Sequence, residues 1–321
     1  MKNFILQGIL FLGIVLAIIL LSLFLIPNKR IINNSLYANI DKHHRLDSLK
    51  SPKIVFVGGS NMAFGLDSKR IEDSLHMPVV NMGLHAGFGL RFMLNEVRNN
   101  VQKGDIVVIS PEYQHFYGDI VNGEKVLVAL MVDVNRNNLK YLSFTQAMHL
   151  IPIAIQYAVS KLMGKQLDIM DEGKVSSYEK VFKRNSFNEY GDEEMHWRFP
   201  NQHVQIMYAP QNFKEVSTQT LSYIATFKSE INNKGVRLYI IPPAFQHTSF
   251  QKNELIIKEI EKQMSIQNTP FDIQPEVFSY PDSMFFNTAY HLDKTGTELR
   301  THIIIQMLKG NTYKTNKRIN K

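Results

Sequence analysis

Cysteine is absent from the 321-residue sequence, so the chain forms neither disulfides nor metal sites with cysteine ligands. The sequence also has no low-complexity tract and no internal repeat, which excludes solenoid architectures. Its 44% hydrophobic and 20% charged residues are ordinary for a globular protein. Beyond an N-terminal apolar segment, about 270 residues remain, enough for one large domain with its own core.

The net charge of +7 is concentrated at the two ends of the chain. Residues 1–53 carry seven Lys or Arg and two acidic residues, and residues 309–321 carry five Lys or Arg and no acidic residue. The body, residues 54–308, is therefore slightly acidic. We expect the basic ends to attract anionic lipid or to aid solubility, and we expect no nucleic-acid partner.

The longest apolar run extends from Phe4 to Ile26 and ends at Pro27. A bilayer is crossed by about 20 apolar residues, whereas the apolar region of a signal peptide spans about 7–15 and precedes a small-residue cleavage site. No such site precedes Pro27, so we predict an uncleaved transmembrane anchor, with a signal peptide as the alternative. Basic residues after the run, beginning at Lys29, place the domain in the cytoplasm by the positive-inside rule, which weakens for large translocated domains.

Short apolar runs that end in turn residues predict four buried strands, at 53–57, 79–82, 105–109 and 236–241. Helical spacing is found between or after them, at 67–75, 90–101 and 295–308. Strands that alternate with helices predict an α/β fold: a three-layer α/β/α domain with a doubly wound, flavodoxin-like parallel sheet. Sites in such sheets lie at the carboxyl ends of the strands.

The predicted organisation begins with an anchor at 1–30 and a polar linker at 31–52. One domain follows at 53–308, with an insert at about 117–235, and a basic tail at 309–321 ends the chain. Within the insert, Ala147–Val159 is apolar but too short to span a bilayer. We predict a buried helix there, with a surface that touches the bilayer or a membrane partner as the alternative. The segment 187–197 is predicted to be a solvated loop; a metal site at Glu193 and His196 or a loop over the active site are the alternatives.

Two residues are candidates for nucleophilic catalysis. Ser60 directly follows the first predicted strand and two glycines, where a serine is exposed beside backbone amides; alternatively it caps a helix. His291 precedes the last predicted helix, so a doubly wound sheet brings both residues to its carboxyl edge. A general base must come within about 3 Å of its nucleophile.

Three segments resemble a known family. Residues 54–68, IVFVGGSNMAFGLDS, resemble block I of the SGNH/GDSL hydrolase superfamily, with Gly-Gly-Ser in place of Gly-Asp-Ser. Asn81-Met82-Gly83-Leu84 resembles block II, and Tyr290-His291-Leu292 resembles block V. The anchor and the insert are similar to the cell-envelope branch, which includes accessory proteins of alginate O-acetylation and teichoic-acid D-alanylation that work beside a polytopic membrane-bound O-acyltransferase.

The resemblance implies a Ser–His site that acts on acyl esters of an envelope polysaccharide, with the domain outside the cytoplasm and no cofactor. Ser60 attacks the acyl carbonyl, His291 takes its proton, and the amides of Ser60 and Gly83 hold the oxyanion. Transfer to a sugar hydroxyl gives a new ester, and transfer to water makes the protein an esterase.

Two positions depart from the family pattern. Asn287 stands where the family often has the Asp that orients the histidine, and Asp282 or Asp293 is the possible substitute. After the third strand, Glu112 and Gln114 stand near the place of a family Asn that binds the oxyanion; Gln114 can donate a hydrogen bond, whereas a Glu112 carboxylate repels an oxyanion. These departures favour the alternative function, a catalytically degenerate scaffold or binding subunit of an acylation complex.

Overall fold

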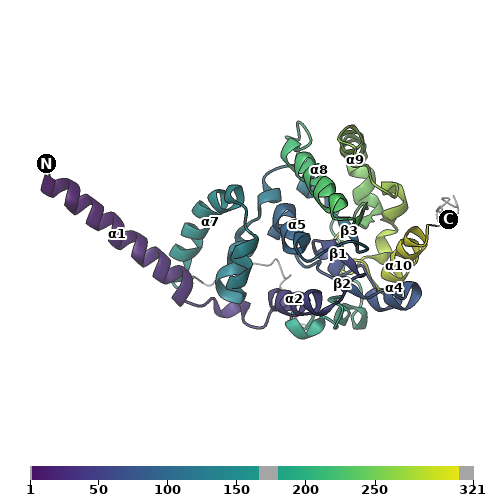
Figure 1. The fold of residues 1–321 in the computed structure, drawn as a ribbon, viewed down its shortest axis with the longest axis horizontal. Helices are drawn as coiled ribbons and strands as arrows, with labels where there is room; N and C mark the ends of the chain where they lie inside the picture. Colours follow the sequence, from purple (N-terminus) through teal and green to yellow (C-terminus); the bar gives the residue numbers. More distant parts are fainter. Residues whose placement is uncertain (1, 166–179, 311–321) are drawn as a thin grey trace.

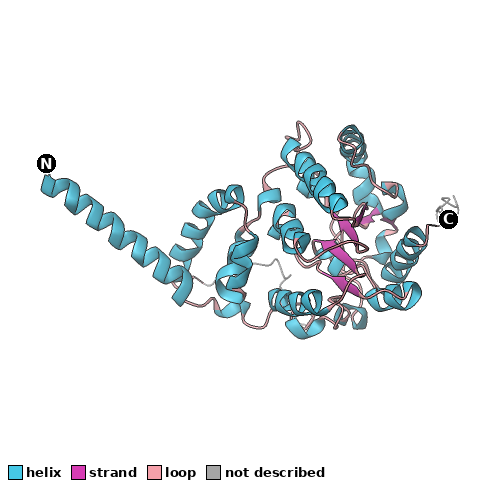
Figure 2. Cartoon of the chain, viewed as in Figure 1, coloured by secondary structure: helices cyan, strands magenta, loops and turns pink. Residues whose placement is uncertain are grey.

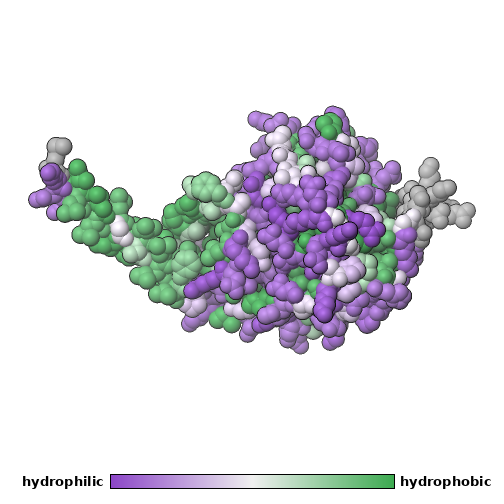
Figure 3. Space-filling model, in the orientation of Figure 1, coloured by the Kyte–Doolittle hydropathy of each residue, from purple (hydrophilic) through white to green (hydrophobic). Residues whose placement is uncertain are grey.

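The computed structural model describes residues 2–165 and 180–310 and shows an α/β body with one long helix leaving it (Figure 1). That helix, α1 (Lys2–Leu25), is the one helix in the described residues that is long and apolar enough to cross a membrane. Figure 3 shows its surface as apolar along almost its whole length. Only Ser22 and Leu23 of α1 are buried, at the end that meets the body.

Four parallel strands form the central sheet, in the order β2-β1-β3-β4. Their bounds are β1 Ile54–Gly58, β2 Val79–Asn81, β3 Ile106–Ser110 and β4 Arg237–Ile240. Figure 2 shows the strands in magenta. All four were predicted from the sequence, and β1, β2 and β3 are buried throughout, as continuous apolar runs indicate. In the register, Gly58 pairs with Ser110, so the segments that follow β1 and β3 begin side by side.

The helices beside the sheet agree with the predicted pattern. Predicted and confirmed are α4 (Ser68–Leu75), α5 (Leu90–Arg98) and α10 (Lys294–Leu308). Further helices are α3 (Ser60–Ala63), α8 (Thr218–Asn233) and α9 (His247–Ile266); a two-stranded parallel ribbon pairs β5 (Phe245–Gln246) with β6 (Ser279–Tyr280). α8 contacts α5 and β4, so the end of the predicted insert belongs to the helices packed around the sheet.

The prediction of a polar linker at 31–52 is wrong. This segment forms the short 3₁₀ helix Ser35–Tyr37 and then α2 (Ala38–Ser48), which packs on the body near β2. Three of the five buried residues of α2 are polar, and all three make side-chain hydrogen bonds: Asn39, Lys42 and His43. A hydrophobic period does not reveal a helix whose buried residues are mostly polar.

The insert contains α6 (Lys125–Ala129), a π-helical turn at Leu130–Val134, and α7 (Phe144–Leu162). The N-terminus of α7 is fixed by a capping box in which the Ser143 hydroxyl accepts from the Gln146 amide. The sequence predicted a buried helix here, but α7 is buried on one face only. Residues 166–179 of the insert, and the predicted tail from residue 311 on, lie outside the described residues.

Candidate functional site

Ser60 is positioned by the turn between β1 and α3. Gly59, the residue before α3, packs so closely that an added Cβ would come within 2.5 Å of Glu112 Oε1 and 2.9 Å of the Ala86 backbone. Ser60 is the first residue of α3, and no side chain caps that helix, so the cap alternative for its hydroxyl does not hold. Its hydroxyl has no hydrogen-bond partner within residues 2–165 and 180–310 and lines a cavity.

His291 lies in a loop before α10, and hydrogen bonds within this loop hold the His291 backbone in place. The Phe286 amide donates to the His291 carbonyl (2.8 Å), and Thr288 Oγ1 accepts from the His291 amide (3.2 Å). The imidazole stacks on the ring of Phe64, with centroids 4.0 Å apart and planes at 6°. The amide of Phe64 donates to the carbonyl of Ser60 (2.9 Å), so the ring on which the imidazole stacks follows Ser60 by one helical turn.

Asn287 Oδ1 lies 2.8 Å from His291 Nδ1. A carbonyl oxygen can only accept, so this contact keeps the proton on Nδ1 and leaves the lone pair on Nε2, the tautomer that a general base requires. An Asn in this position is also found in the Cys-His-Asn sites of papain-like proteases. Neither Asp282 nor Asp293 substitutes for it: Asp282 accepts from the Thr248 amide, and Asp293 caps α10.

Burial dominates the electrostatics of His291. It lowers the pKa of the imidazole to about 3, with smaller contributions from His196 and His85. The ring is therefore neutral at pH 7, in the form that accepts a proton. Because Asn287 carries no charge, it does little to stabilise the imidazolium that proton transfer would create.

Ser60 and His291 face one cavity of about 220 Å³ at the carboxyl edge of the sheet. Its other polar lining includes Asn287, Glu112, Gln114 and His85, and its apolar walls come from Phe64, Leu84, Phe182, Phe187 and Met207. Phe182 and Phe187 come from the insert, which therefore forms part of the cavity. The site is a mainly apolar chamber with a few convergent polar groups, the usual composition of a small-molecule pocket.

The prediction that Gly83 donates to an oxyanion is not supported by the geometry. Its amide donates to Asn81 Oδ1 (2.9 Å), and Gly83 does not line the cavity. An added Cβ would come within 2.4 Å of Met62 Cβ, which explains the glycine by close packing. Gln114 does line the cavity, and its Nε2 donates to Glu112 Oε2 (2.9 Å).

His85 is a donor that the sequence did not reveal. Its Nδ1 accepts from the Gly87 amide (2.9 Å), which places the proton on Nε2. Burial lowers the pKa of His85 to about 4, with a smaller contribution from His115, so the ring is a neutral N–H donor at pH 7. A neutral imidazole that polarises a carbonyl is an established catalytic arrangement. The only sequence signal was its position two residues after Gly83.

Glu112 lines the cavity and contacts Asn61, the residue after Ser60. Its Oε1 accepts from the Asn61 amide and side chain (both 3.2 Å), and the carboxylate is 2% exposed. On the other side of Asn61, the buried Arg300 donates to its carbonyl (2.6 Å) and to its Oδ1 (3.0 Å). Burial lowers the pKa of Arg300 to about 10. Arg300, which lies in α10 and holds the residue after Ser60 in place, was not identified from the sequence.

The segment 187–197 is not the solvated loop that the sequence predicted. Asp192, Glu193 and His196 are all at most 1% exposed. His196 Nδ1 contacts Glu193 Oε2, and its Nε2 donates to the Leu292 carbonyl (2.9 Å), next to His291. Among the described residues, no three His, Asp or Glu side chains are grouped so that they could hold a metal ion. The Glu193–His196 pair therefore connects the insert to the loop that carries His291.

No protein-family model matches the chain, and no curated protein matches it at a significant level.

Proposed function

We propose that the protein is an SGNH-like acyltransferase or esterase that works through Ser60 and His291. The observation that carries the proposal is the shared cavity, which is lined both by Ser60 and by His291, the imidazole whose Nδ1 proton is held by Asn287 Oδ1. The resemblance of the three sequence blocks gives the same pair, and the strand order, with β1 between β2 and β3, supports a doubly wound three-layer fold.

In the proposed reaction, Ser60 Oγ attacks the acyl carbonyl carbon while His291 Nε2 takes the hydroxyl proton. The imidazolium then protonates the leaving alcohol, and an acyl-serine ester remains. A sugar hydroxyl or water attacks this ester, His291 takes its proton, and Ser60 regains a proton as the new ester or free acid leaves. His85 Nε2–H, Gln114 Nε2–H and the Ser60 amide are the donors available for the oxyanion.

The substrate class in this proposal is an acyl ester of a cell-envelope polysaccharide. The mainly apolar chamber suits a short acyl chain, while the glycan remains outside it. α1 anchors the protein as a single-pass membrane protein, with the domain on the extracytoplasmic side and a membrane-bound O-acyltransferase as its partner. The last three points rest on the family resemblance and on the length of α1.

The experiment is labelling of the full-length chain by a serine-directed fluorophosphonate. Wild type should label, and Ser60→Ala should not. Ser35 lines the same cavity, so Ser35→Ala is the matched control and should label normally. A wild-type chain that never labels, together with unchanged envelope acylation in cells that carry Ser60→Ala, contradicts the catalytic proposal.

A second candidate function, a binding or scaffold subunit without turnover, is favoured by Glu112. Its carboxylate lies against the Ser60 turn, where negative charge opposes an oxyanion, and the Gly83 amide is already engaged. Glu112→Gln separates the two functions, because removal of the charge should raise the labelling rate of an enzyme severalfold. The exposed Glu124, changed to Gln, is the control. Glycan-ester binding without labelling in either variant would establish the second function.

A further inference from the structure

Helix α7 carries an exposed apolar stripe. Six of its side chains are 41–82% exposed and follow one another at spacings of three or four residues: Phe144, Met148, Ile151, Ile155, Val159 and Leu162. This spacing places them on one face of the helix, while Leu150, Tyr157 and Lys161 are buried on the opposite face. A contiguous exposed apolar face is unusual for a soluble surface and marks an interaction site.

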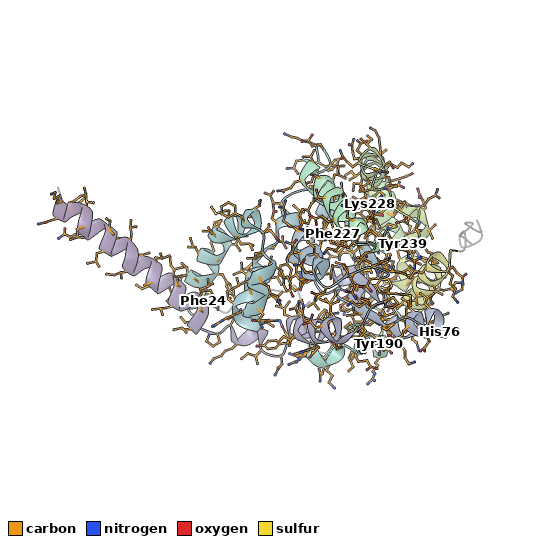
Figure 4. All side chains as sticks on the ribbon, in the orientation of Figure 1. Phe24, His76, Tyr190, Phe227, Lys228 and Tyr239 are labelled. Carbon is orange, nitrogen blue, oxygen red and sulfur yellow. The ribbon has the colours of Figure 1, made fainter. Side chains whose placement is uncertain are left out.

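The stripe continues the apolar surface of α1. The two helices are in contact: Ser22 Oγ donates to the Ala158 carbonyl (2.6 Å), and Lys161 Nζ donates to the Leu23 carbonyl (2.9 Å). Figure 4 labels Phe24 where α1 meets this part of the body, and Figure 3 shows apolar surface passing from α1 onto the adjoining helices. The small side chains of Ser22 and Ala158 allow this close approach.

The contact lies within the part of α1 that would cross a bilayer. Ile19 of α1 is half-buried and packs against the core cluster that includes Tyr157 and Ala158. Ile19 precedes the end of the apolar run at Ile26 by seven residues, or roughly 10 Å at about 1.5 Å per residue. When α1 spans a bilayer, a helix that packs beside these residues reaches the lipid as well.

The charges around this contact suit the membrane interface. Lys161 is the only Lys, Arg, Asp or Glu of α7, and it is paired with Asp133 (2.6 Å) away from the stripe. Exposed basic residues lie beside the end of α1: Lys29 follows it, and Arg136 donates to the Phe24 carbonyl (2.6 Å). Basic side chains beside an apolar face attract anionic lipid headgroups.

We propose that α7 is an interfacial helix whose stripe is buried in the lipid bilayer beside α1, as a second membrane contact of the body. The occupant is the bilayer itself, since the stripe is continuous with the spanning helix and bordered by basic residues. This proposal does not depend on the catalytic site.

The absence of cysteine makes the test direct. Single cysteines are placed at Met148 and Ile155 on the stripe, at Leu12 within α1, and at Leu255 on α9. Leu255 is the matched control, an apolar side chain that is 85% exposed on the part of the body remote from α1 (Figure 1). Each full-length variant is labelled with an environment-sensitive fluorophore and reconstituted in vesicles of phosphatidylcholine and phosphatidylglycerol that contain lipids brominated on the acyl chains.

The expected result is quenching at Met148→Cys and Ile155→Cys that is severalfold stronger than at Leu255→Cys and approaches that at Leu12→Cys. Urea unfolding of each variant in detergent checks that the fold is retained, which exposed substitutions should allow. Quenching at 148 and 155 no stronger than at 255, with strong quenching at 12, would overturn the proposal and leave water or a protein partner on the stripe.

Discussion

Two buried histidines lie against the same aromatic ring and have opposite environments. His196, from the insert, is 5.0 Å from the Phe64 centroid, and both of its ring nitrogens are engaged, by Glu193 and by the Leu292 carbonyl. His291 is 4.0 Å from the same centroid, and it lines the cavity with Ser60; among residues 2–165 and 180–310, only its Nδ1 has a hydrogen-bond partner. The first histidine has the bonding of a structural residue, and the second keeps one nitrogen for chemistry.

Substituting each histidine by alanine is the most direct test of this difference between them. His291→Ala should lower the labelling rate by about 10³-fold or more, because the base of a nucleophile–base pair is lost, while the fold survives. His196→Ala should mainly lower stability: the buried Glu193 loses the imidazole and keeps the backbone amides of residues 195 and 196, which costs about 3–5 kcal/mol in the free energy of unfolding. Urea unfolding and probe labelling of both variants measure the two effects. Equal losses of labelling, after correction for the unfolded fraction, would contradict the division of roles.

Acidification should reveal the neutral state of His291. Its pKa is lowered to about 3 in the folded chain, whereas an unfolded chain titrates near 6.5, so between these values the unfolded state binds more protons. The stability that depends on neutral His291 is fully present above pH 6.5. As the pH falls, the unfolded chain takes up a proton, and the free energy of unfolding decreases by about 2 kcal/mol between pH 7 and 5. His291→Gln should lose less stability than wild type over this range, as measured by urea unfolding at several pH values.

The exposed His44, changed to Gln, is the control for the pH experiment and should leave the wild-type slope intact. A His291→Gln variant with the same slope as wild type would show that folding does not lower the pKa of His291.

The smallest effect is expected from the orienting residue. Asn287→Asp places a carboxylate on Nδ1, which stabilises imidazolium and raises the pKa of His291, so the labelling rate should rise by about tenfold at pH 7. In the same variant, the acid limb of the pH profile of labelling should move toward neutral pH. Asn287→Ala should lower the rate because the tautomer is no longer fixed. Indistinguishable Asp and Ala variants, in a pH profile of labelling, would count against Asn287 as an orienter.

The sequence revealed those features that depend on local patterns. Continuous apolar runs predicted all four strands of the central sheet, and the positions of Ser60 after β1 and His291 before α10 brought both residues to one edge of a parallel sheet. The predicted order of elements was therefore enough to identify two residues that line the cavity, Ser60 and His291.

Buried polar contacts escaped prediction, because a polar side chain shows its role only when its partner is known. Arg300 meets Asn61 across 239 positions in sequence, and α2 buries Lys42 against the carbonyls of Asn81 and Gly191. The engagement of the Gly83 amide was a local effect: Asn81, two residues earlier, forms an Asx turn that competes for that amide.

The packing of residues 31–48 determines how freely the cavity can move relative to α1. A flexible tether would let the body search the space around its anchor and raise the effective concentration of distant partners. Here nine residues, which include the 3₁₀ turn Lys29–Ile31, connect α1 to the Ser35–Tyr37 turn and α2, both packed on the body, and α1 is itself bonded to α7. With α1 in a bilayer, the cavity stays at one height and one orientation above the lipid. In the proposed reaction, the acyl donor and the acceptor must then be brought to that plane, because this chain cannot move its cavity toward them.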